Sequence, residues 1–235
     1  MCGILGYSHI GKCLPADVLM SALKALRHRG PDHQGSFCSE QISLGAVRLR
    51  ILDLEGGDQP LFSSDRDVVI VFNGEIFNCP ELRAQLEAEG FGFETRCDTE
   101  VVLNAFLQWD TQCFSRLRGM FALAIWVRSA GRLILARDRM GIKPLYYCLQ
   151  DGDIYFGSEL KCILMHPSVR RHICLKGLNC FLSLNYVPGP FTLVESITKL
   201  MPGHFLEWRN GLHSLRSVCL RSECRKGPPL HRRRL

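Results

Sequence analysis

Short apolar runs, each bounded by turn-forming residues, recur along much of the chain. Alternating or continuous apolar runs of this length are typical of β-strands that bury one or both faces. The predicted strands are residues 4–7, 42–49, 68–72, 120–127, 133–136 and 154–156. The chain is therefore expected to be rich in short strands.

Three segments between these strands have the apolar spacing of helices. Residues 15–26 place apolar side chains three and four positions apart, and residues 80–89 have proline in the first turn and Gly90 after the end. Residues 99–109 share an apolar face, and Asp98 stands where the N-cap of that helix would lie. Clustered strands with helices between them indicate an α+β layered domain.

The pattern loosens from about residue 175, where Pro188-Gly189-Pro190 and Pro202-Gly203 interrupt short apolar stretches. Residues 212–235 have no amphipathic period and end in an arginine-rich run, which is typical of a disordered tail. We therefore predict one domain over residues 1–208, with its core ending near residue 190, and a basic, disordered tail over residues 209–235 that does not belong to the fold.

Composition agrees with a soluble globular protein. The 235 residues are 46% hydrophobic and 22% charged, and the longest apolar run, residues 120–127, is too short to cross a bilayer. The start of the chain lacks the basic opening and the apolar run of a secretion signal, so we expect a cytoplasmic protein. The twelve cysteines include no C-x-x-C pair, so we expect reduced thiols and no structural metal.

The formal net charge of +6 comes from the end of the chain. Residues 212–235 hold six arginines and one lysine against one glutamate, whereas residues 1–211 hold 22 basic and 22 acidic residues. A nucleic-acid-binding surface would therefore have to lie in the tail. The tail lacks interleaved aromatic residues for base stacking, so a solvated run of charge is the more ordinary interpretation.

Cys2, which directly follows the initiator methionine, is the first candidate for chemistry. A small residue at this position allows removal of the methionine, which leaves a thiol and an α-amine on one residue. Their reference pKa values are about 8.5 and about 7.7 to 8.0, so the amine can exchange a proton near neutral pH. Cys2 can thus act as a nucleophile with its own amine as the base. The alternative is a small buried residue that opens a strand.

A polar segment, Asn73-Gly74-Glu75, follows the predicted strand 68–72. An Asn-Gly pair usually marks a tight turn, and we expect a turn here. In a catalytic interpretation, the Asn73 amide and the Gly74 backbone N–H point together at the oxygen of a tetrahedral intermediate, and glycine permits a close approach. The residues by themselves leave both interpretations open.

Seven segments in a fixed order carry a resemblance to a known family. They are RHRGPDHQG (27–35), RLRILDLEGGDQPL (48–61), FNGEIFN (72–78), CDTEVVL (97–103), GMFALAIW (119–126), RDRMGIKPLYY (137–147) and GSELK (157–161). Together with the opening Met1-Cys2-Gly3-Ile4, they resemble the N-terminal class II glutamine amidotransferase domain of glutamine-hydrolysing asparagine synthetases, from residue 1 to about residue 208. The resemblance implies a four-layer α/β/β/α Ntn-hydrolase sandwich with two antiparallel sheets, which agrees with the α+β pattern.

The resemblance also implies an activity and its catalytic residues. The domain would hydrolyse L-glutamine to glutamate and ammonia through a thioester on Cys2, with Asn73 and Gly74 as the oxyanion hole. The ammonia would serve the ATP-dependent amidation of aspartate to asparagine. Residues 137–147 and 157–161 also match the family, and we assign them structural roles in positioning strands and in facing a neighbouring domain.

The same resemblance implies how the substrate is held. Arg48 would bind the α-carboxylate, a task suited to a planar and permanently charged guanidinium. Glu75 and Asp98 would hold the α-ammonium, and the backbone around Ile51 and Leu52 would line the pocket. Without the resemblance, Arg48 would be an ordinary surface arginine at a strand end, Glu75 a solvated turn carboxylate and Asp98 a helix cap.

Members of this family continue into an ATP-dependent domain that receives the ammonia. The present sequence contains no Ser-Gly-Gly-x-Asp-Ser phosphate loop, so we expect no cofactor for the glutaminase step and assign ATP and Mg²⁺ to the missing synthetase domain. The expected partners are L-glutamine, a synthetase domain or subunit, and a second copy of the chain, with no nucleic acid and no membrane. The rival hypothesis is an inactive truncated fragment, or a binding protein that acts through the basic tail.

Overall fold

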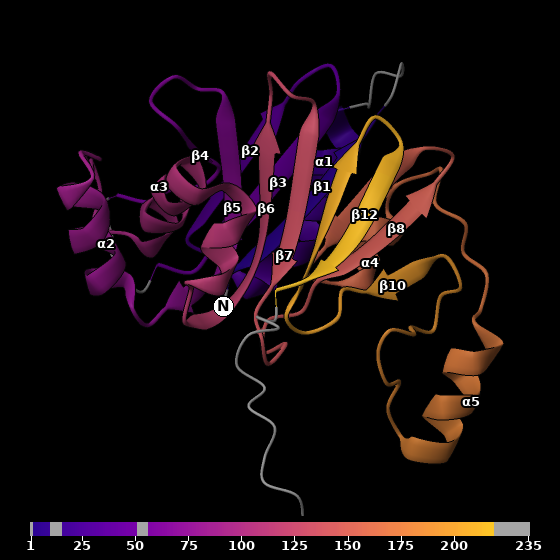
Figure 1. Cartoon of the computed structure of the whole chain (residues 1–235). Coiled ribbons are helices and arrows are strands. Elements are labelled where there is room, and N and C mark those ends of the chain that lie inside the picture. The colour runs from indigo at the N-terminus through magenta and orange to yellow at the C-terminus, as the bar shows by residue number, and fades with distance from the viewer. Residues whose placement is uncertain (1, 10–15, 51–55, 219–235) are drawn as a thin grey trace, which may run out of the picture.

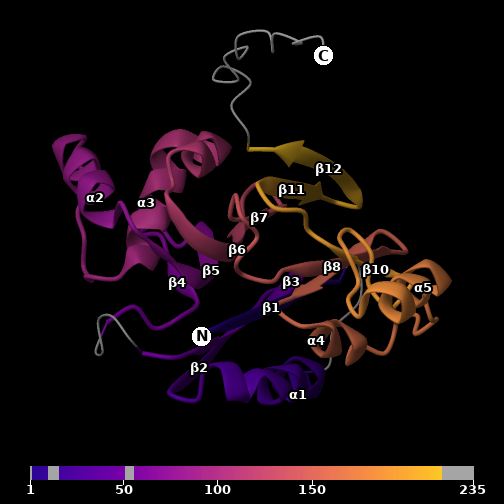
Figure 2. The ribbon, with the colours of Figure 1, turned by 90° about the horizontal axis from the view of Figure 1, so that it is seen from below.

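Two antiparallel sheets lie face to face and carry helices on their outer faces (Figures 1 and 2). The computed structural model describes residues 2–9, 16–50 and 56–218. Within these residues each sheet has six strands, in the orders β10-β8-β9-β1-β3-β2 and β12-β11-β7-β6-β5-β4. The four-layer α/β/β/α sandwich implied by the resemblance is therefore confirmed.

The first sheet is built around the start of the chain. Its central strand β1 pairs antiparallel with β3 on one side, in the register Gly3↔Val47, and with β9 on the other, in the register Leu5↔Gly157. The strands of this sheet are β1 (Gly3–Ser8), β2 (His33–Cys38), β3 (Ile42–Arg48), β8 (Tyr146–Gln150), β9 (Asp153–Gly157) and β10 (Ile197–Lys199). The residue before β1, Cys2, therefore lies at the end of a central strand.

The second sheet contains the polar segment that follows the apolar run 68–72. Its longest strands, β5 and β6, pair from Val68↔Val127 to Ile76↔Gly119. The strands of this sheet are β4 (Leu61–Phe62), β5 (Val68–Ile76), β6 (Gly119–Val127), β7 (Arg132–Arg137), β11 (His204–Arg209) and β12 (Leu212–Ser217). At one edge of the sheet, the two-residue β4 covers only part of β5.

The helices cover the two sheets separately. Apolar side chains of α1 and α4 pack on the first sheet, and those of α2 and α3 pack on the second. The helices are α1 (Ala16–Leu26), α2 (Cys79–Ala88), α3 (Asp98–Trp109), α4 (Leu160–Leu164) and α5 (Leu175–Leu184), with 3₁₀ turns η1 (Arg27–Arg29) and η2 (Asp110–Ser115). The helix α5 lies at the periphery, away from both helical layers (Figure 1).

Strand β5 shows why its sequence is a continuous apolar run. Val69 and Val71 belong to the core between the two sheets, whereas Ile70 and Phe72 belong to the core beneath α2 and α3. Successive side chains of a strand point to opposite faces, so a strand with both faces covered must be apolar at every position. All five residues from Val68 to Phe72 are buried.

All six predicted strands and all three predicted helices are present, whereas β2, β4, β8 and α4 were not predicted. The predicted strand 68–72 continues to Ile76, because its pairing with β6 does not stop at the Asn-Gly pair. The region beyond residue 175, where we expected little regular structure, holds α5 and three strands. Residues 212–217, which we assigned to the tail, form β12 and pair with β11. The division of the chain at residue 208 stays a prediction, and residues 219–235 lie outside the described residues.

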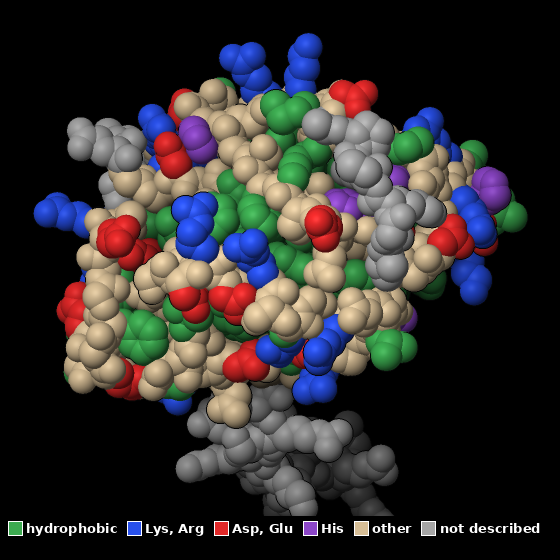
Figure 3. Space-filling model, turned by 90° about the horizontal axis from the view of Figure 1, so that it is seen from above, with side chains coloured by type: hydrophobic (Ala, Val, Ile, Leu, Met, Phe, Trp, Pro, Cys, Tyr) green, Lys and Arg blue, Asp and Glu red, His purple; other side chains and the backbone are tan. Residues whose placement is uncertain are grey.

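One face of the described protein has mixed charge (Figure 3). On the face seen in Figure 3, Lys and Arg side chains are interspersed with Asp and Glu side chains. In the described part of the chain, no helix combines the length and the apolar character that a membrane crossing requires.

Candidate active site

The polar residues of β5 lie inside the strand and not in a turn, so the predicted turn at Asn73-Gly74 is wrong. Asn73 pairs with Ala122, Gly74 with Phe121 and Glu75 with Met120. Only glycine fits at position 74, because a Cβ atom there would lie 2.4 Å from the Met120 carbonyl oxygen and 2.7 Å from the Phe121 Cβ. The close approach of β6 therefore explains the glycine, and no turn is needed.

Cys2 is held at the start of β1 by contacts from both sides. The Arg29 Nε atom donates a hydrogen bond of 3.0 Å to the Cys2 carbonyl oxygen, and the Cys2 thiol lies 3.9 Å from the Leu49 carbonyl oxygen. The side chain is half-buried, and Cys2 does not take part in a disulfide. Cys2 is thus anchored through its backbone, while its sulfur lines a cavity.

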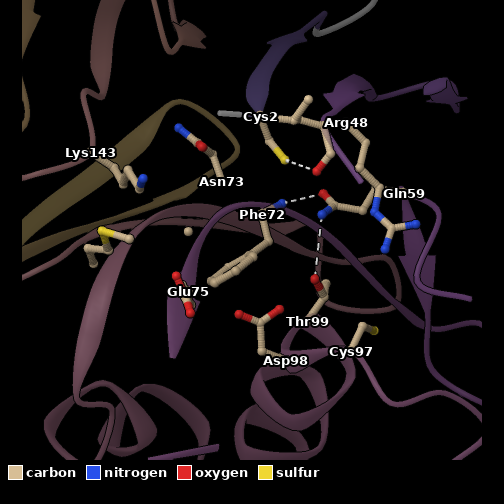
Figure 4. A pocket seen from close by; sticks show the side chains of 13 residues that line it. Cys2, Arg48, Gln59, Phe72, Asn73, Glu75, Cys97, Asp98, Thr99 and Lys143 are labelled. Carbon is tan, nitrogen blue, oxygen red and sulfur yellow. Dashed lines mark hydrogen bonds between the residues drawn. The ribbon is translucent and has the colours of Figure 1, made fainter. Parts of the chain in front are cut away.

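This cavity, of about 100 Å³, brings together most of the predicted site residues (Figure 4). Its volume is below the roughly 300–1,000 Å³ typical of sites for drug-sized ligands, and it suits a small polar molecule. The predicted residues that line it are Cys2, Arg48, Asn73, Gly74, Glu75 and Asp98. The predicted contributions of Ile51 and Leu52 lie outside the described residues. Segments far apart in the sequence therefore converge on one small space.

Two hydrogen-bond donors of β5 line this cavity. The Asn73 side chain is 1% exposed, and its Nδ2 atom is buried without a hydrogen-bond partner. Buried amide groups are almost always hydrogen-bonded, so an unpaired one at a cavity wall indicates a missing acceptor. Gly74 is the next residue of the strand and lines the same cavity. An acceptor oxygen bound here would satisfy the Asn73 amide.

Arg48, at the end of β3, is engaged with the loop that follows. Its NH1 atom donates to the Gly56 carbonyl oxygen at 2.6 Å and to Asp58 Oδ1 at 2.9 Å. Arg50 donates to the other carboxylate oxygen of Asp58 at 2.8 Å. Partial burial opposes ionisation of Asp58, but the hydrogen bonds from Arg50 and Arg48 hold its pKa below the ordinary value. The Arg48 guanidinium therefore lines the cavity and is paired with the Asp58 carboxylate.

Asp98 does not act as the helix cap that we predicted. The helix α3 begins at Asp98, and its N-cap residue is Cys97, whose side chain makes no capping hydrogen bond. The Asp98 carboxylate instead reaches across to β5, where its Oδ2 atom accepts a hydrogen bond of 3.1 Å from the Ile76 N–H. Tertiary packing of α3 against β5 thus redirects the side chain into the cavity.

The environment of Asp98 alters its ionisation. Burial raises the pKa of Asp98 to about 6, and the nearby charge of Glu75 adds to this, while backbone hydrogen bonds oppose it. A cation placed between Asp98 and Glu75 would relieve both the burial and the repulsion. The arrangement therefore favours an ammonium group at this end of the cavity.

The cavity also includes residues that the sequence analysis did not place in the site. They are Leu49, Gln59, Phe72, Cys97, Thr99, Met120 and Lys143. Gln59 lies in the segment 48–61 that carries the family resemblance, and this position was the only signal that could have drawn attention to it. Lys143 was expected to be structural, but its buried side chain lines the cavity.

The rest of the segment 137–147 positions strands, as we expected, and its role in facing a neighbouring domain stays a prediction. Asp138 is fully buried and accepts hydrogen bonds from the backbone N–H groups of Phe121 and Lys143, at 3.2 and 3.0 Å. Arg137 donates to the Lys143 and Leu200 carbonyl oxygens. These bonds join β6 and β7 to the loop that carries Lys143.

Neither metal sites nor disulfides occur in the part of the chain that the structure describes. Its nine cysteines are free, and no group of three or more His, Cys, Asp or Glu side chains could hold a metal ion.

Comparisons with known proteins agree with this geometry. The model of the glutamine amidotransferase domain matches residues 1–218. Asparagine synthetase [glutamine-hydrolyzing] 1 of Bacillus subtilis is 39% identical over 207 residues, which are 86% of this chain and 33% of that protein. A putative asparagine synthetase [glutamine-hydrolyzing] 2 of Methanocaldococcus jannaschii is 34% identical over 221 residues, 85% of this chain and 42% of that protein. The chain thus spans well under half the length of these relatives.

A solved structure provides an independent comparison of the fold. The glutamine phosphoribosylpyrophosphate amidotransferase of B. subtilis superposes with a TM-score of 0.67 at 20% identity, over 93% of this chain and 50% of that chain. At this identity the likeness concerns the fold alone, and the fold is that of the Ntn hydrolases. Because the domain model matches nearly the whole chain and the fold agrees, the chain belongs to the family of class II glutamine amidotransferase domains.

Proposed function

We propose that this chain hydrolyses the side-chain amide of L-glutamine to glutamate and ammonia, with Cys2 as the nucleophile. Membership of the amidotransferase domain family supports this reaction class. The arrangement of the cavity supports the assignment of roles, since a thiol, two oxyanion donors, a guanidinium and two carboxylates line the same small space. Each of these groups matches one part of a glutamine molecule.

One observation supports the proposal more than any other. The buried Asn73 Nδ2 atom has no partner, although it lies in a wall of the cavity that Cys2 also lines. The polarised oxygen of a tetrahedral intermediate on Cys2 would supply the missing acceptor. Because such donors are in place before the reaction, they stabilise the developing negative charge without reorganisation.

The reaction consists of two successive acyl transfers at the amide carbon of glutamine. After removal of Met1, the Cys2 α-amine accepts the thiol proton, and the sulfur attacks the amide carbon of glutamine. The tetrahedral intermediate collapses when the amine returns the proton to the leaving nitrogen, so ammonia departs and a thioester remains. Water, deprotonated by the same amine, then attacks the thioester and releases glutamate and the free thiol.

The substrate is oriented by charge at the far end of the cavity. Arg48 binds the α-carboxylate, while Asp98 and Glu75 bind the α-ammonium. The substrate carboxylate competes with Asp58 for the Arg48 guanidinium, which now donates to that side chain at 2.9 Å. The backbone at Ile51 and Leu52 completes the pocket in this proposal.

The test is a glutaminase assay on protein whose N-terminal residue has been checked by mass spectrometry. We expect Cys2→Ala to abolish glutamate formation and Cys38→Ala, a change of an exposed cysteine outside the cavity, to leave it intact. Retained turnover in Cys2→Ala would refute the proposal. An acid-stable glutamyl adduct found on Cys2 by mass spectrometry would support the thioester.

We further propose that the ammonia is passed to an ATP-dependent partner that amidates aspartate. The names of the relatives support this, since they describe glutamine-hydrolysing asparagine synthetases of which this chain matches 33 to 42%. In this proposal the glutaminase step needs no cofactor, so a chelator leaves it unchanged, whereas ATP and Mg²⁺ act on the partner. Cytoplasmic location and pairing with a second copy stay predictions, which cell fractionation and sedimentation would test.

The rival hypothesis of an inert fragment or a tail-dependent binding protein is not favoured. No observation on the described residues supports it, and the residues of the basic tail beyond 218 lie outside them. Binding through that tail would be steeply salt-dependent, because it would rest on phosphate contacts.

A further inference from the structure

The edge of β5 nearest the cavity is only partly covered by β4. The register Leu61↔Ile70 and Phe62↔Val69 would place residue 59 opposite residue 72 if β4 continued. The chain leaves the sheet there, and the Gln59 side chain takes over the missing bond. Its Oε1 atom accepts a hydrogen bond of 2.6 Å from the Phe72 N–H. A side chain thus performs the pairing that a strand would otherwise provide.

This bond lies next to the donors of the oxyanion hole. In an antiparallel sheet, every second residue directs its N–H to the same edge, so Phe72, Gly74 and Ile76 share one edge of β5. The Phe72 N–H is bound by Gln59 at 2.6 Å, and the Ile76 N–H is bound by Asp98 at 3.1 Å. The Gly74 N–H lies between them, where no described strand pairs with that edge.

The other end of the Gln59 amide reaches α3. Its Nε2 atom donates to Thr99 Oγ1 at 3.4 Å, and Thr99 directly follows Asp98 (Figure 4). Gln59 is 5% exposed, and both Gln59 and Thr99 line the cavity. One buried amide therefore connects the strand that carries Asn73 and Gly74 to the helix turn that carries Asp98.

The backbone of Gln59 is fixed by its neighbour strand. A Cβ atom on Gly35 of β2 would lie 1.9 Å from the Gln59 carbonyl oxygen, so the two segments touch through backbone atoms alone. Glycine at position 35 is what permits this contact. The amide of Gln59 therefore extends from a backbone that is held in place by both sheets.

We propose that Gln59 is a positioning residue of the amidotransferase site, which sets the placement of the Asn73 and Gly74 donors relative to Asp98. The inference rests on the proposed function, because those donors matter only if an oxyanion forms at Cys2. Donors of this kind act within about 2.7–3.1 Å of the oxyanion, so a small shift of β5 weakens transition-state binding. Substrate binding at Arg48 and Asp98 is affected much less.

The test compares three variants in the glutaminase assay. Gln59→Met keeps the length of the side chain but removes both hydrogen bonds, and we expect kcat to fall about tenfold or more with KM changed by less than about twofold. Gln59→Glu keeps the oxygen that Phe72 needs, and the Thr99 hydroxyl can donate to it, so most of the lost kcat should return. Gln85→Met, on the exposed face of α2, is the matched control and should have wild-type kcat.

A second readout does not depend on turnover. Amide hydrogen exchange at Phe72 should become faster by about tenfold or more in Gln59→Met, because its acceptor is gone, while Val71, which pairs with β6, should be unchanged. Thermal unfolding of each variant shows whether it is folded. If Gln59→Met is not folded, Thr99→Val, which removes the acceptor of the Gln59 Nε2 atom, takes its place and should lower kcat relative to Gln59→Glu.

The outcomes separate the two proposals. If the wild-type protein hydrolyses no glutamine, the proposed function fails, and Phe72 exchange still decides whether Gln59 positions β5. If the wild-type protein is active and folded Gln59→Met retains its kcat, the inference about Gln59 is wrong and the proposed function stands. A rise in KM alone, or unchanged Phe72 exchange, would also overturn the inference.

Discussion

Two of the concave regions in the described part of the protein differ greatly in size, and the smaller of the two has the groups suited to chemistry. The groove beside α5 has a volume of about 520 Å³, against about 100 Å³ for the cavity at Cys2. Within the groove, the Thr192 hydroxyl is already bonded to the main chain of Val194 and Ile197, and the Cys174 sulfur caps its own helix. A polar group that already has a hydrogen-bond partner within the protein gains little by binding a ligand.

The cavity at Cys2 differs in the state of its polar groups. Its Asn73 amide is buried and unpaired, and the pKa of Asp98 is raised to about 6 by burial. Unsatisfied and electrostatically disfavoured groups lower the stability of a folded protein, so their presence in one place indicates a ligand that compensates for them. The comparison shows that a buried amide without a partner and a buried carboxyl with a raised pKa identify this candidate site better than cavity volume does.

The sharpest test of the comparison is to remove the unpaired amide. Asn73→Ala should lower kcat for glutamine hydrolysis by about 100- to 1,000-fold, because one oxyanion donor is lost, and KM should change little. Steady-state kinetics would measure both constants. The control is Asn179→Ala on the exposed face of α5, which removes the same group far from the cavity. Equal activities of the two variants would contradict the assignment.

The second test concerns stability. The pKa of Asp98 is raised from 3.8 to about 6 in the folded protein, so its contribution to stability is fully present below pH 3.8 and is lost as pH rises through 6. The loss amounts to at most about 3 kcal/mol. Asp98→Asn removes this titration. The free energy of unfolding of the variant minus that of wild type should therefore be larger at pH 7.5 than at pH 4. Urea unfolding at the two pH values measures this, and a pH-independent difference would refute it.

The third test concerns binding of the substrate ammonium. In the inactive Cys2→Ala background, the Kd for glutamine should rise about tenfold from pH 7 to pH 5, because protonation of a carboxyl with pKa about 6 removes the charge that binds the ammonium. Isothermal calorimetry gives the Kd directly. Adding Asp98→Asn should make binding weak and independent of pH in this range. An unchanged slope in that double variant would assign the titration to another group.

The smallest effect is expected in the groove. Lys176→Ala changes an exposed residue of its wall, and substitutions of this kind alter stability by about 0.5 kcal/mol or less. Glutaminase activity should stay within about twofold of wild type, because no part of the proposed reaction lies there. A large loss of activity in a stably folded Lys176→Ala variant would show that the groove beside α5 is also part of the site.

Much of the site could be named from the sequence, since its residues lie in short segments that resemble a known family. Cys2, Arg48, Asn73, Gly74, Glu75 and Asp98 all line the cavity, as the resemblance implied. The strand pattern was also sound where apolar runs are buried on both faces, as at residues 68–72. The apolar pattern predicts such strands well because burial requires an apolar side chain at each buried position.

Other features depend on contacts between distant segments and have no local signal. The Asn-Gly pair favours a turn by its local propensity, but pairing of β5 with β6 up to Ile76↔Gly119 keeps it in a strand. The Asp98 side chain would cap its own helix if α3 stood alone, and it binds the Ile76 N–H because β5 ends beside it. Tertiary packing overrides the local preference at both positions.

The sequence by itself determined the family, six of the strands, the first three helices and the candidate groups for the chemistry. Only the tertiary structure decided which polar atoms are left without a partner, which carboxyl has a raised pKa, and which glutamine replaces a missing strand at the edge of β5. The physical reason is that burial and hydrogen bonding belong to pairs of segments. No single stretch of sequence contains both members of such a pair.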